Sequence, residues 1–183
     1  MPRSNTPSEA PRILTSLLST RAAAGRGDQL PDSSAAAAWL ADQGLASADL
    51  KVTEAEWQRL LALREGLYAL IPARGRRWTK EAALHFNRTI RDAPLEVSVT
   101  LDRTLRFASP ERGFHGAFGR IVSLLVDSYF AGQWKRLKAC ANDECLQVFY
   151  DDSPSGTRKW CDERCGDKVR TRKHRSAKRH GRR

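Results

Sequence analysis

Four cysteines, all that the chain contains, lie in its last quarter as two close pairs. Four residues separate Cys140 from Cys145, three separate Cys161 from Cys165, and fifteen lie between the pairs. Zinc favours four soft or borderline ligands in a tetrahedron, and two short Cys-x(n)-Cys turns supply them without straining the backbone. The spacing therefore predicts a zinc site with four cysteine ligands.

Such a site would be structural. Four cysteine ligands leave no open position on Zn²⁺ for a water molecule or a substrate, so we expect no catalytic role for the metal. Two disulfides are the alternative use of four cysteines. The N-terminal residues lack an apolar run long enough for an export signal, and no stretch of eighteen apolar residues could span a membrane. We therefore expect a cytoplasmic, reducing environment, which favours thiolates on zinc.

Positive charge is concentrated in the C-terminal part of the chain. Residues 135–183 carry +8 of the formal net charge of +11. Residues 168–183 contain nine Lys and Arg and no acidic residue, so this end cannot neutralise itself. One interpretation is a solvated, disordered tail without a specific partner. The other is binding to nucleic acid, which is the polyanion that such charge most readily binds. Eight basic residues are candidate phosphate contacts: Arg158, Lys159, Lys168, Arg170, Arg172, Lys173, Arg175 and Arg179.

The local pattern around the cysteines predicts a small treble-clef-like module. The apolar run after Cys145, followed by a turn at 151–156, indicates a knuckle and a short hairpin. Cys161 and Cys165 are spaced i and i+4, which places both sulfurs on one face of the first turn of a helix. A module with so few large apolar residues needs a metal to fold, because it cannot bury enough surface by itself.

Helical patterns dominate the chain before the cysteines. Asp32 is a helix N-cap, Thr53 and Glu56 form a capping box, and Thr79 caps a further helix. The segment Ser109-Pro110-Glu111 supplies a cap, an N1 proline and a first-turn acid for the last long helix. Helices are expected over residues 11–18, 33–43, 54–71, 80–93 and 110–131.

One segment of this region has the alternation of strands. Apolar residues at every second position over 95–101, and again at Leu105 and Phe107, predict two short antiparallel strands. We therefore expect a mainly α fold with a small antiparallel β-hairpin, in which a helical N-terminal domain precedes the treble-clef-like zinc module. The predicted divisions are a disordered N-terminus (1–10), an alanine-rich helical domain (11–134), a zinc finger (135–175) and a basic disordered tail (176–183).

No motif indicates an enzyme. The chain has no Ser/His/Asp arrangement, paired carboxylates or phosphate-binding loop that rises above chance, and His85 and His115 are isolated. The five tryptophans fit core packing better than the lining of a ligand pocket. We expect no catalytic residues.

The cysteine module resembles a known family, the CGNR zinc finger. The resemblance rests on Cys-x4-Cys, on the segments 148–153 (Val-Phe-Tyr-Asp-x-Ser) and 158–161 (Arg-Lys-Trp-Cys), and on Cys165-Gly166. The family takes its name from its last cysteine and the next three residues. Here Asp167 stands where the family has Asn, and Lys168 stands where it has Arg, which keeps the charge but loses the planar fork of the guanidinium.

The upstream region is similar to the ABATE-type helical domain that accompanies this finger. The likeness is carried by residues 27–30 (Gly-Asp-Gln-Leu), 38–40 with Gly44-Leu45, 61–65 (Leu-Ala-Leu-Arg-Glu) and Phe86-Asn87. The resemblance implies a bacterial, nucleoid-associated, stress-induced transcription regulator. Its finger would bind double-stranded DNA, and its helical domain would sense a small-molecule effector or form a homodimer.

Two other functions remain open from the residues alone. Phosphate attraction does not distinguish DNA from RNA, so an RNA- or ribosome-associated protein could use the same charge. A zinc-ordered module for protein interaction is the third alternative, in which the metal only shapes a docking surface.

Overall fold

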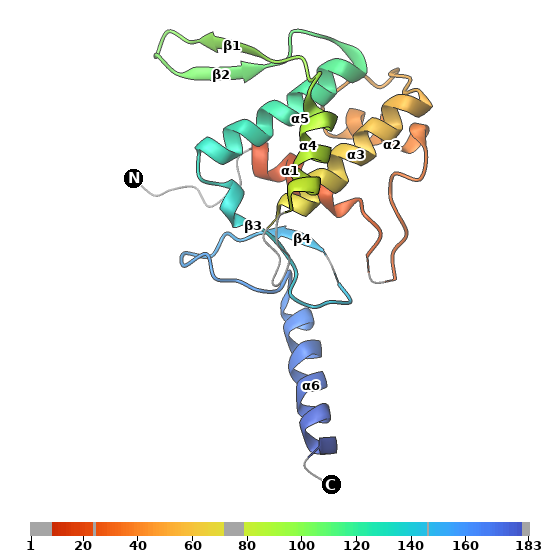
Figure 1. The fold of residues 1–183 in the computed structure, drawn as a ribbon, viewed down its shortest axis with the longest axis vertical. Helices are drawn as coiled ribbons and strands as arrows, with labels where there is room; N and C mark the ends of the chain where they lie inside the picture. The colour runs from red at the N-terminus through yellow and green to blue at the C-terminus, as the bar shows by residue number, and fades with distance from the viewer. Residues whose placement is uncertain (1–8, 24, 72–78, 146, 181–183) are drawn as a thin grey trace.

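The computed structural model describes residues 9–23, 25–71, 79–145 and 147–180 (Figure 1). The expected mainly helical fold with small antiparallel hairpins is confirmed. The helices are α1 (Glu9–Ser19), α2 (Ser33–Asp42), α3 (Glu54–Leu70), α4 (Lys80–Ile90), α5 (Gly113–Phe130) and α6 (Glu163–His180), with a short 3-10 turn at Trp134–Arg136. The strands are β1 (Glu96–Val99), β2 (Leu105–Ala108), β3 (Leu137–Ala139) and β4 (Val148–Tyr150).

The capping residues act as the sequence predicts. The Asp32 carboxylate accepts a hydrogen bond from the backbone N–H of Ala35 at 2.8 Å. Thr53 and Glu56 complete a reciprocal capping box at the start of α3, and the Thr79 side chain caps α4. Each interaction satisfies backbone donors that would otherwise have no partner at a helix start, which is why these three helices begin where expected.

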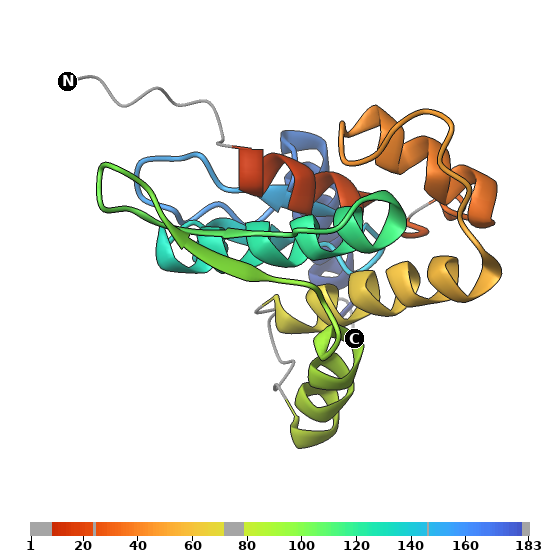
Figure 2. The same cartoon turned by 90° about the horizontal axis from the view of Figure 1, so that it is seen from above.

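The start of α5 differs from the prediction. The helix begins at Gly113, after the Ser109-Pro110-Glu111 segment that was expected to open it. This segment instead lies against the side of α5. A Cβ atom on Gly116 would come within 2.3 Å of the Glu111 carbonyl oxygen, and one on Gly119 within 2.7 Å of the Pro94 carbonyl oxygen. The two glycines thus let the root of the β1–β2 hairpin approach α5 at backbone contact distance. Figure 2 shows the hairpin crossing α5.

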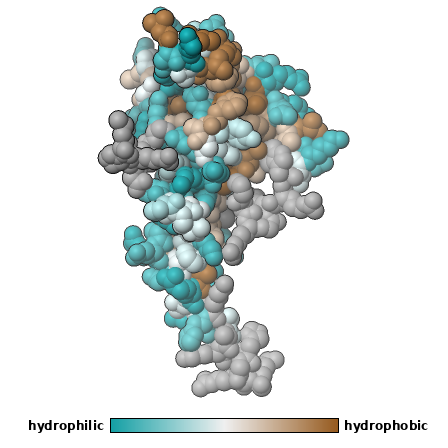
Figure 3. Space-filling model, turned by 90° about the vertical axis from the view of Figure 1, so that its left-hand side faces the viewer, coloured by the Kyte–Doolittle hydropathy of each residue, from teal (hydrophilic) through white to brown (hydrophobic). Residues whose placement is uncertain are grey.

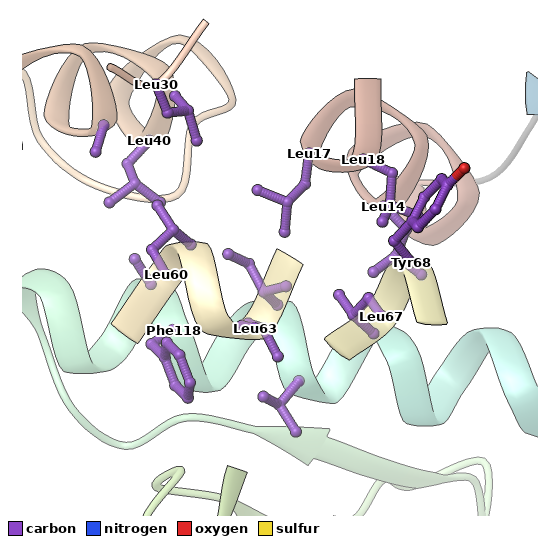
Figure 4. Close-up of a cluster of buried hydrophobic side chains, with 14 of the residues drawn as sticks. Leu14, Leu17, Leu18, Leu30, Leu40, Leu60, Leu63, Leu67, Tyr68 and Phe118 are labelled. Carbon is purple, nitrogen blue, oxygen red and sulfur yellow. The ribbon is translucent and has the colours of Figure 1, made fainter. Parts of the chain in front are cut away.

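The hydrophobic core lies between α1, α3 and α5, with α2 closing one side (Figure 4). Leucines spaced by three or four residues along α1 and α3 meet Phe118 and Ile121 of α5 in this cluster, as amphipathic helices require. Its fully buried members include Leu14, Leu17, Leu30, Leu40, Leu60, Leu63, Leu67, Phe118 and Ile121.

The core continues into the β3–β4 hairpin of the cysteine module. Leu137 and Val148 are buried in the same cluster as the helical leucines. The Ser19 hydroxyl donates to the Val148 carbonyl at 3.4 Å, and the Gln147 amide donates to the Ser19 hydroxyl at 3.3 Å. This part of the module therefore does not depend on a metal alone, because the helical region supplies it with a core.

A buried ion pair joins two motifs that lie far apart in the sequence. Arg64 on α3, whose side chain is 5% exposed, makes a bidentate contact with Asp28 at 2.8 and 2.6 Å. Arg64 also donates to the Thr20 hydroxyl and to Glu65. The hydrogen bonds from Arg64 keep the pKa of Asp28 below its ordinary value. The pair fixes the loop that follows α1, in which Arg26 donates a hydrogen bond to the Gln147 side chain of the cysteine module at 3.4 Å.

Two further features concern the ends of the fold. Helix α6 continues through residues 176–180, which the sequence assigned to a disordered tail, because Ala, Lys and Arg are good helix formers and Gly181 is the next residue that disfavours a helix. The rest of the predicted tail, residues 181–183, and most of the predicted N-terminal segment, residues 1–8, lie outside the described residues.

Among the described helices, none combines the length and apolarity that crossing a membrane demands.

We expect Arg64→Met to lower the free energy of unfolding by about 2–3 kcal/mol. Removing one partner of a buried ion pair costs about 3–5 kcal/mol, and the Asp28 side chain is 33% exposed, which reduces the loss. Urea denaturation followed by far-UV circular dichroism measures the change. Arg120→Met is the matched control, because the exposed Arg120–Glu9 pair should contribute less than about 1 kcal/mol. Equal losses in the two variants would contradict this account of Arg64.

Candidate metal centre and basic helix

The fold brings the four cysteines together. Their sulfur atoms all lie within 4.8 Å of one another, with the Sγ atoms of Cys145 and Cys165 each 3.6 Å from that of Cys161. All four are free thiols rather than disulfides. Cys140 and Cys165 are buried, and Cys145 and Cys161 are partly buried.

The donor set fits a tetrahedral metal ion. Four sulfurs at about 2.3 Å from a central zinc would stand about 3.8 Å apart, close to the separations of 3.6 Å found here. Thiolates are soft ligands that suit zinc, and no carboxylate or histidine belongs to this cluster of described residues. The cysteines are therefore a candidate metal site with closed coordination.

The electrostatics of the cluster also call for a cation. Burial raises the pKa of Cys145, and burial together with the neighbouring thiols raises the pKa of Cys161. Burial also acts to raise the pKa of Cys165, but hydrogen bonds, first that from Asn142, outweigh it and lower the pKa. Ionisation of all four thiols would place four negative charges close together, so a bound dication would offset their repulsion and would release their protons.

The first cysteine pair sits on a knuckle that joins β3 to β4. The backbone N–H of Cys140 donates to the Gln147 carbonyl, and the N–H of Cys145 donates to the Asn142 carbonyl, both at 2.8 Å. The Asn142 side chain is buried and its amide lies 3.8 Å from the sulfur of Cys165, which belongs to the other pair. Asn142 thus links the two halves of the site.

The second pair is positioned by the start of α6. Asp162 accepts a hydrogen bond from the backbone N–H of Cys165 at 2.8 Å, which makes it the N-cap of the helix. Cys161 lies just before the helix, and Cys165 lies in its first turn. Gly166 follows, where an added Cβ would stand 3.3 Å from the Trp160 ring. The glycine therefore lets this indole pack against the helix beside the sulfurs.

A buried aspartate organises the loop between the two pairs. Asp151 is fully buried, forms an ion pair with the Lys138 ammonium at 2.5 Å, and accepts hydrogen bonds from Ser153 and from the backbone N–H of Arg158. Lys138 also donates to the Gly156 carbonyl. Burial alone would raise the pKa of Asp151, but these hydrogen bonds outweigh it and lower the pKa to about 2.

Arg158, one of the predicted phosphate contacts, stabilises the backbone at the second cysteine pair. Its guanidinium donates to the backbone carbonyls of Trp160 at 3.3 Å and Cys161 at 2.6 Å, and it pairs with Asp152 at 3.1 Å. A guanidinium with these bonds is held within the module, although it remains exposed at the surface.

Two of the predicted arginines on α6 are also paired. Arg170 forms an ion pair with Asp167 at 2.7 Å, and Arg172 forms one with Glu144 of the first knuckle at 2.8 Å. The Arg172 contact links α6 to the knuckle. Both pairs are exposed, so neither contributes much to stability.

The remaining predicted residues divide into two groups. Lys159, Lys168 and Arg175 are exposed and have no ion pair among the described residues. Lys173 and Arg179 lie in the helical backbone of α6, but their side chains fall outside the described ones. After Val169, every side chain of α6 that the structure describes is exposed, and Figure 1 shows the helix projecting away from the body of the molecule.

Sequence reasoning missed several residues of the site. Arg164 lies four residues before Lys168 and eleven before Arg175, so helical periodicity puts all three on one side of α6. This spacing could have identified it. The roles of Asn142 and Lys138 depend on contacts across the module, and their positions in the sequence carry no comparable signal.

We expect Asp151→Asn to destabilise the module by about 2–4 kcal/mol, since it leaves the Lys138 ammonium without its buried counter-charge. The carboxylate has a lowered pKa, so its contribution is present above about pH 4 and is lost as the pH falls towards about 2. Unfolding free energies at pH 7 and pH 3 test both points. Asp152→Asn, which changes an exposed neighbour, should cost less than about 1 kcal/mol. The difference in free energy of unfolding between the two variants should be smaller at pH 3 than at pH 7. An equal difference at both pH values would contradict the role given to the Asp151 carboxylate.

Comparison with known proteins agrees with this architecture. Residues 136–178 match the zf-CGNR family, described as "CGNR zinc finger". Residues 12–132 match the ABATE family, described as "Putative stress-induced transcription regulator". No curated protein matches the chain significantly. Because the second match alone covers more than half of the sequence, the chain belongs to the ABATE family and carries a C-terminal CGNR zinc finger.

Proposed function

We propose that this chain is a DNA-binding transcription regulator that holds a structural Zn²⁺ ion on Cys140, Cys145, Cys161 and Cys165. One observation carries the proposal above the others: α6 is a long basic helix that projects from the protein with its described side chains exposed after Val169. It has 18 residues, a length of about 27 Å at 1.5 Å per residue. A cationic helix whose described side chains are exposed beyond Val169 favours an anionic partner that surrounds it.

Helix geometry favours duplex DNA over RNA. The major groove of B-form DNA is about 12 Å wide and admits an α-helix, whereas the major groove of A-form RNA is too deep and narrow for side chains to read. Basic residues occur on more than one side of α6, since Arg170 lies across the helix from the row that contains Lys168 and Arg175. In a groove, phosphates flank a helix on both sides, which suits this distribution.

Exposed basic residues without an ion pair and ion-paired arginines have different roles in this proposal. Lys159, Lys168 and Arg175, together with Arg164, would contact phosphates, because they have no ion pair among the described residues. Arg158 and Arg172 would instead fix the orientation of α6 relative to the knuckles through the contacts described above. Phosphate contacts supply affinity and register, and carry no sequence information directly.

Zinc would act only on structure. The four thiolates would tie the first knuckle to the first turn of α6, so the metal would set the direction in which the helix leaves the body. No catalytic step is assigned to any residue. A small-molecule effector for the helical domain and a cytoplasmic, nucleoid-associated location remain predictions, and no residue is assigned to an effector.

Removal of the metal should release α6 while the helical core persists. We expect one Zn²⁺ ion per chain by elemental analysis, and loss of duplex binding when a chelator removes it, because structural zinc contributes about 10–16 kcal/mol to modules of this kind. Most of the far-UV signal from α1, α3 and α5 should remain, since their core contains no sulfur ligand. Restored binding after addition of Zn²⁺ is the control. Reduced protein that binds DNA equally well without metal would refute the role of zinc.

We expect the double substitution Lys168→Ala with Arg175→Ala to weaken duplex binding and to reduce the log–log salt slope by about 1.8, because each phosphate contact contributes about 0.9. Electrophoretic mobility shifts over a series of salt concentrations measure the slope. The matched control is Arg88→Ala with Arg91→Ala, which removes the same charge from exposed positions at the end of α4.

Three outcomes separate the alternatives. An unchanged slope in the α6 variant, or equal changes in the two variants, would contradict the proposed interface. Competition by duplex RNA as effective as that by duplex DNA would favour the RNA alternative. Partner binding that persists at high salt, with no measurable affinity for either nucleic acid, would favour a protein-interaction module.

A further inference from the structure

Large apolar side chains are exposed in one region of the molecule. Among the described residues, seven large apolar side chains are exposed. All except Leu84 lie on the β1–β2 hairpin or at the end of α5. Figure 3 shows apolar surface gathered at this end of the protein and mostly hydrophilic surface along the opposite end. We call these six residues the hairpin patch: Val97, Val99, Leu101, Leu105, Tyr129 and Phe130.

The strand register makes the patch continuous. Val97 lies opposite Phe107 and Val99 lies opposite Leu105, so these four side chains share one face of the hairpin. Phe107 in turn stacks on Phe130 of α5, with ring centroids 6.3 Å apart and planes within 5°. The apolar face of the hairpin and the end of α5 therefore form a single surface.

The hairpin is also incomplete as a sheet. In the part of the chain that the structure describes, β1 and β2 pair only with each other, which leaves an open edge on each strand. A two-stranded hairpin is marginally stable without further packing, and open edges with apolar side chains are sites where another chain can add. Val99 is 68% exposed and Leu105 is 59% exposed, so α5 covers this face only in part.

We propose that the hairpin patch is a homodimer interface, occupied by the same patch of a second copy of this chain. The charge around the hairpin patch favours a second copy of this chain as the partner. Residues 91–112, which contain the hairpin, carry four basic and four acidic residues and are neutral overall, in a chain with a net charge of +11. Two copies can therefore meet here without the repulsion that the basic C-terminal part would cause. A two-fold interface needs a patch that is complementary to itself, and mixed charge around an apolar centre provides one.

The area is sufficient for a dimer. Tyr129 is 67% exposed and Phe130 is 76% exposed, and an aromatic residue buries about 150–250 Å² when it is fully covered. The six side chains together offer on the order of 700 Å² per copy, close to the roughly 800 Å² per partner of a standard interface. Patches of this size are larger than most monomers expose.

The arrangement leaves the basic helices free. The hairpin and α6 lie at opposite ends of the long axis in Figure 1. Association through the hairpin patch would therefore cover neither copy's α6, and a dimer would present two helices to nucleic acid. The interface does not depend on DNA binding, so either proposal can fail without the other.

Sedimentation equilibrium of the zinc-loaded full chain over a concentration series tests the interface. We expect a reversible monomer–dimer equilibrium for the wild type. Val99→Lys should weaken the association on the order of 100-fold, because it places an unpaired charge at the centre of an apolar contact. Leu84→Lys is the matched control, since it makes the same change at an exposed apolar residue outside the patch and should leave the dissociation constant unchanged.

Two results would overturn the proposal. One is a wild type that stays monomeric at every concentration, in which case the patch belongs to a different partner. The other is an equal effect of Val99→Lys and Leu84→Lys. Leu105→Ser provides a second variant on the neighbouring strand and should weaken the dimer in the same direction. Far-UV circular dichroism and zinc content verify that each variant is folded.

Discussion

The four sulfurs within 4.8 Å of one another are the constraint on which the C-terminal quarter of this protein depends. They join a knuckle between two short strands to the first turn of an 18-residue helix. Few other contacts hold that helix, since its described side chains are exposed after Val169. Burial opposes ionisation of Cys145 and Cys161, so a cation bound by the four sulfurs would favour their thiolate forms.

The direction of α6 is also tied to the helical region. Leu137 and Val148 enter the main core, Ser19 at the end of α1 contacts β4, and the loop after α1 contacts Gln147 through Arg26. That loop is fixed in turn by the buried Arg64–Asp28 pair. A continuous path of packed side chains and hydrogen bonds therefore leads from α3 to the metal site.

Local signals in the sequence predicted much of the fold. The caps at Asp32, Thr53 and Thr79 and the alternation around Val97 and Val99 depend on neighbours within a few residues, and the structure confirms them. The start of α5 was misplaced because a Ser-Pro-Glu signal was overridden by packing against Gly116 and Gly119. The tail was assigned to disorder on its charge, yet its intrinsic helix propensity extends α6 to His180.

The amino-acid sequence by itself determined the candidate metal ligands and the location of the positive charge, because ligand type, short spacing and composition are local properties. Only the tertiary structure decided which basic side chains form ion pairs within the protein and which are left exposed. It paired Arg172 with Glu144 across the module and left Lys168 exposed, although both are basic residues of one helix. It also brought Arg64 to Asp28 and left the apolar face of the hairpin partly uncovered. Such pairings depend on distances between segments remote in the chain, and no local pattern encodes them.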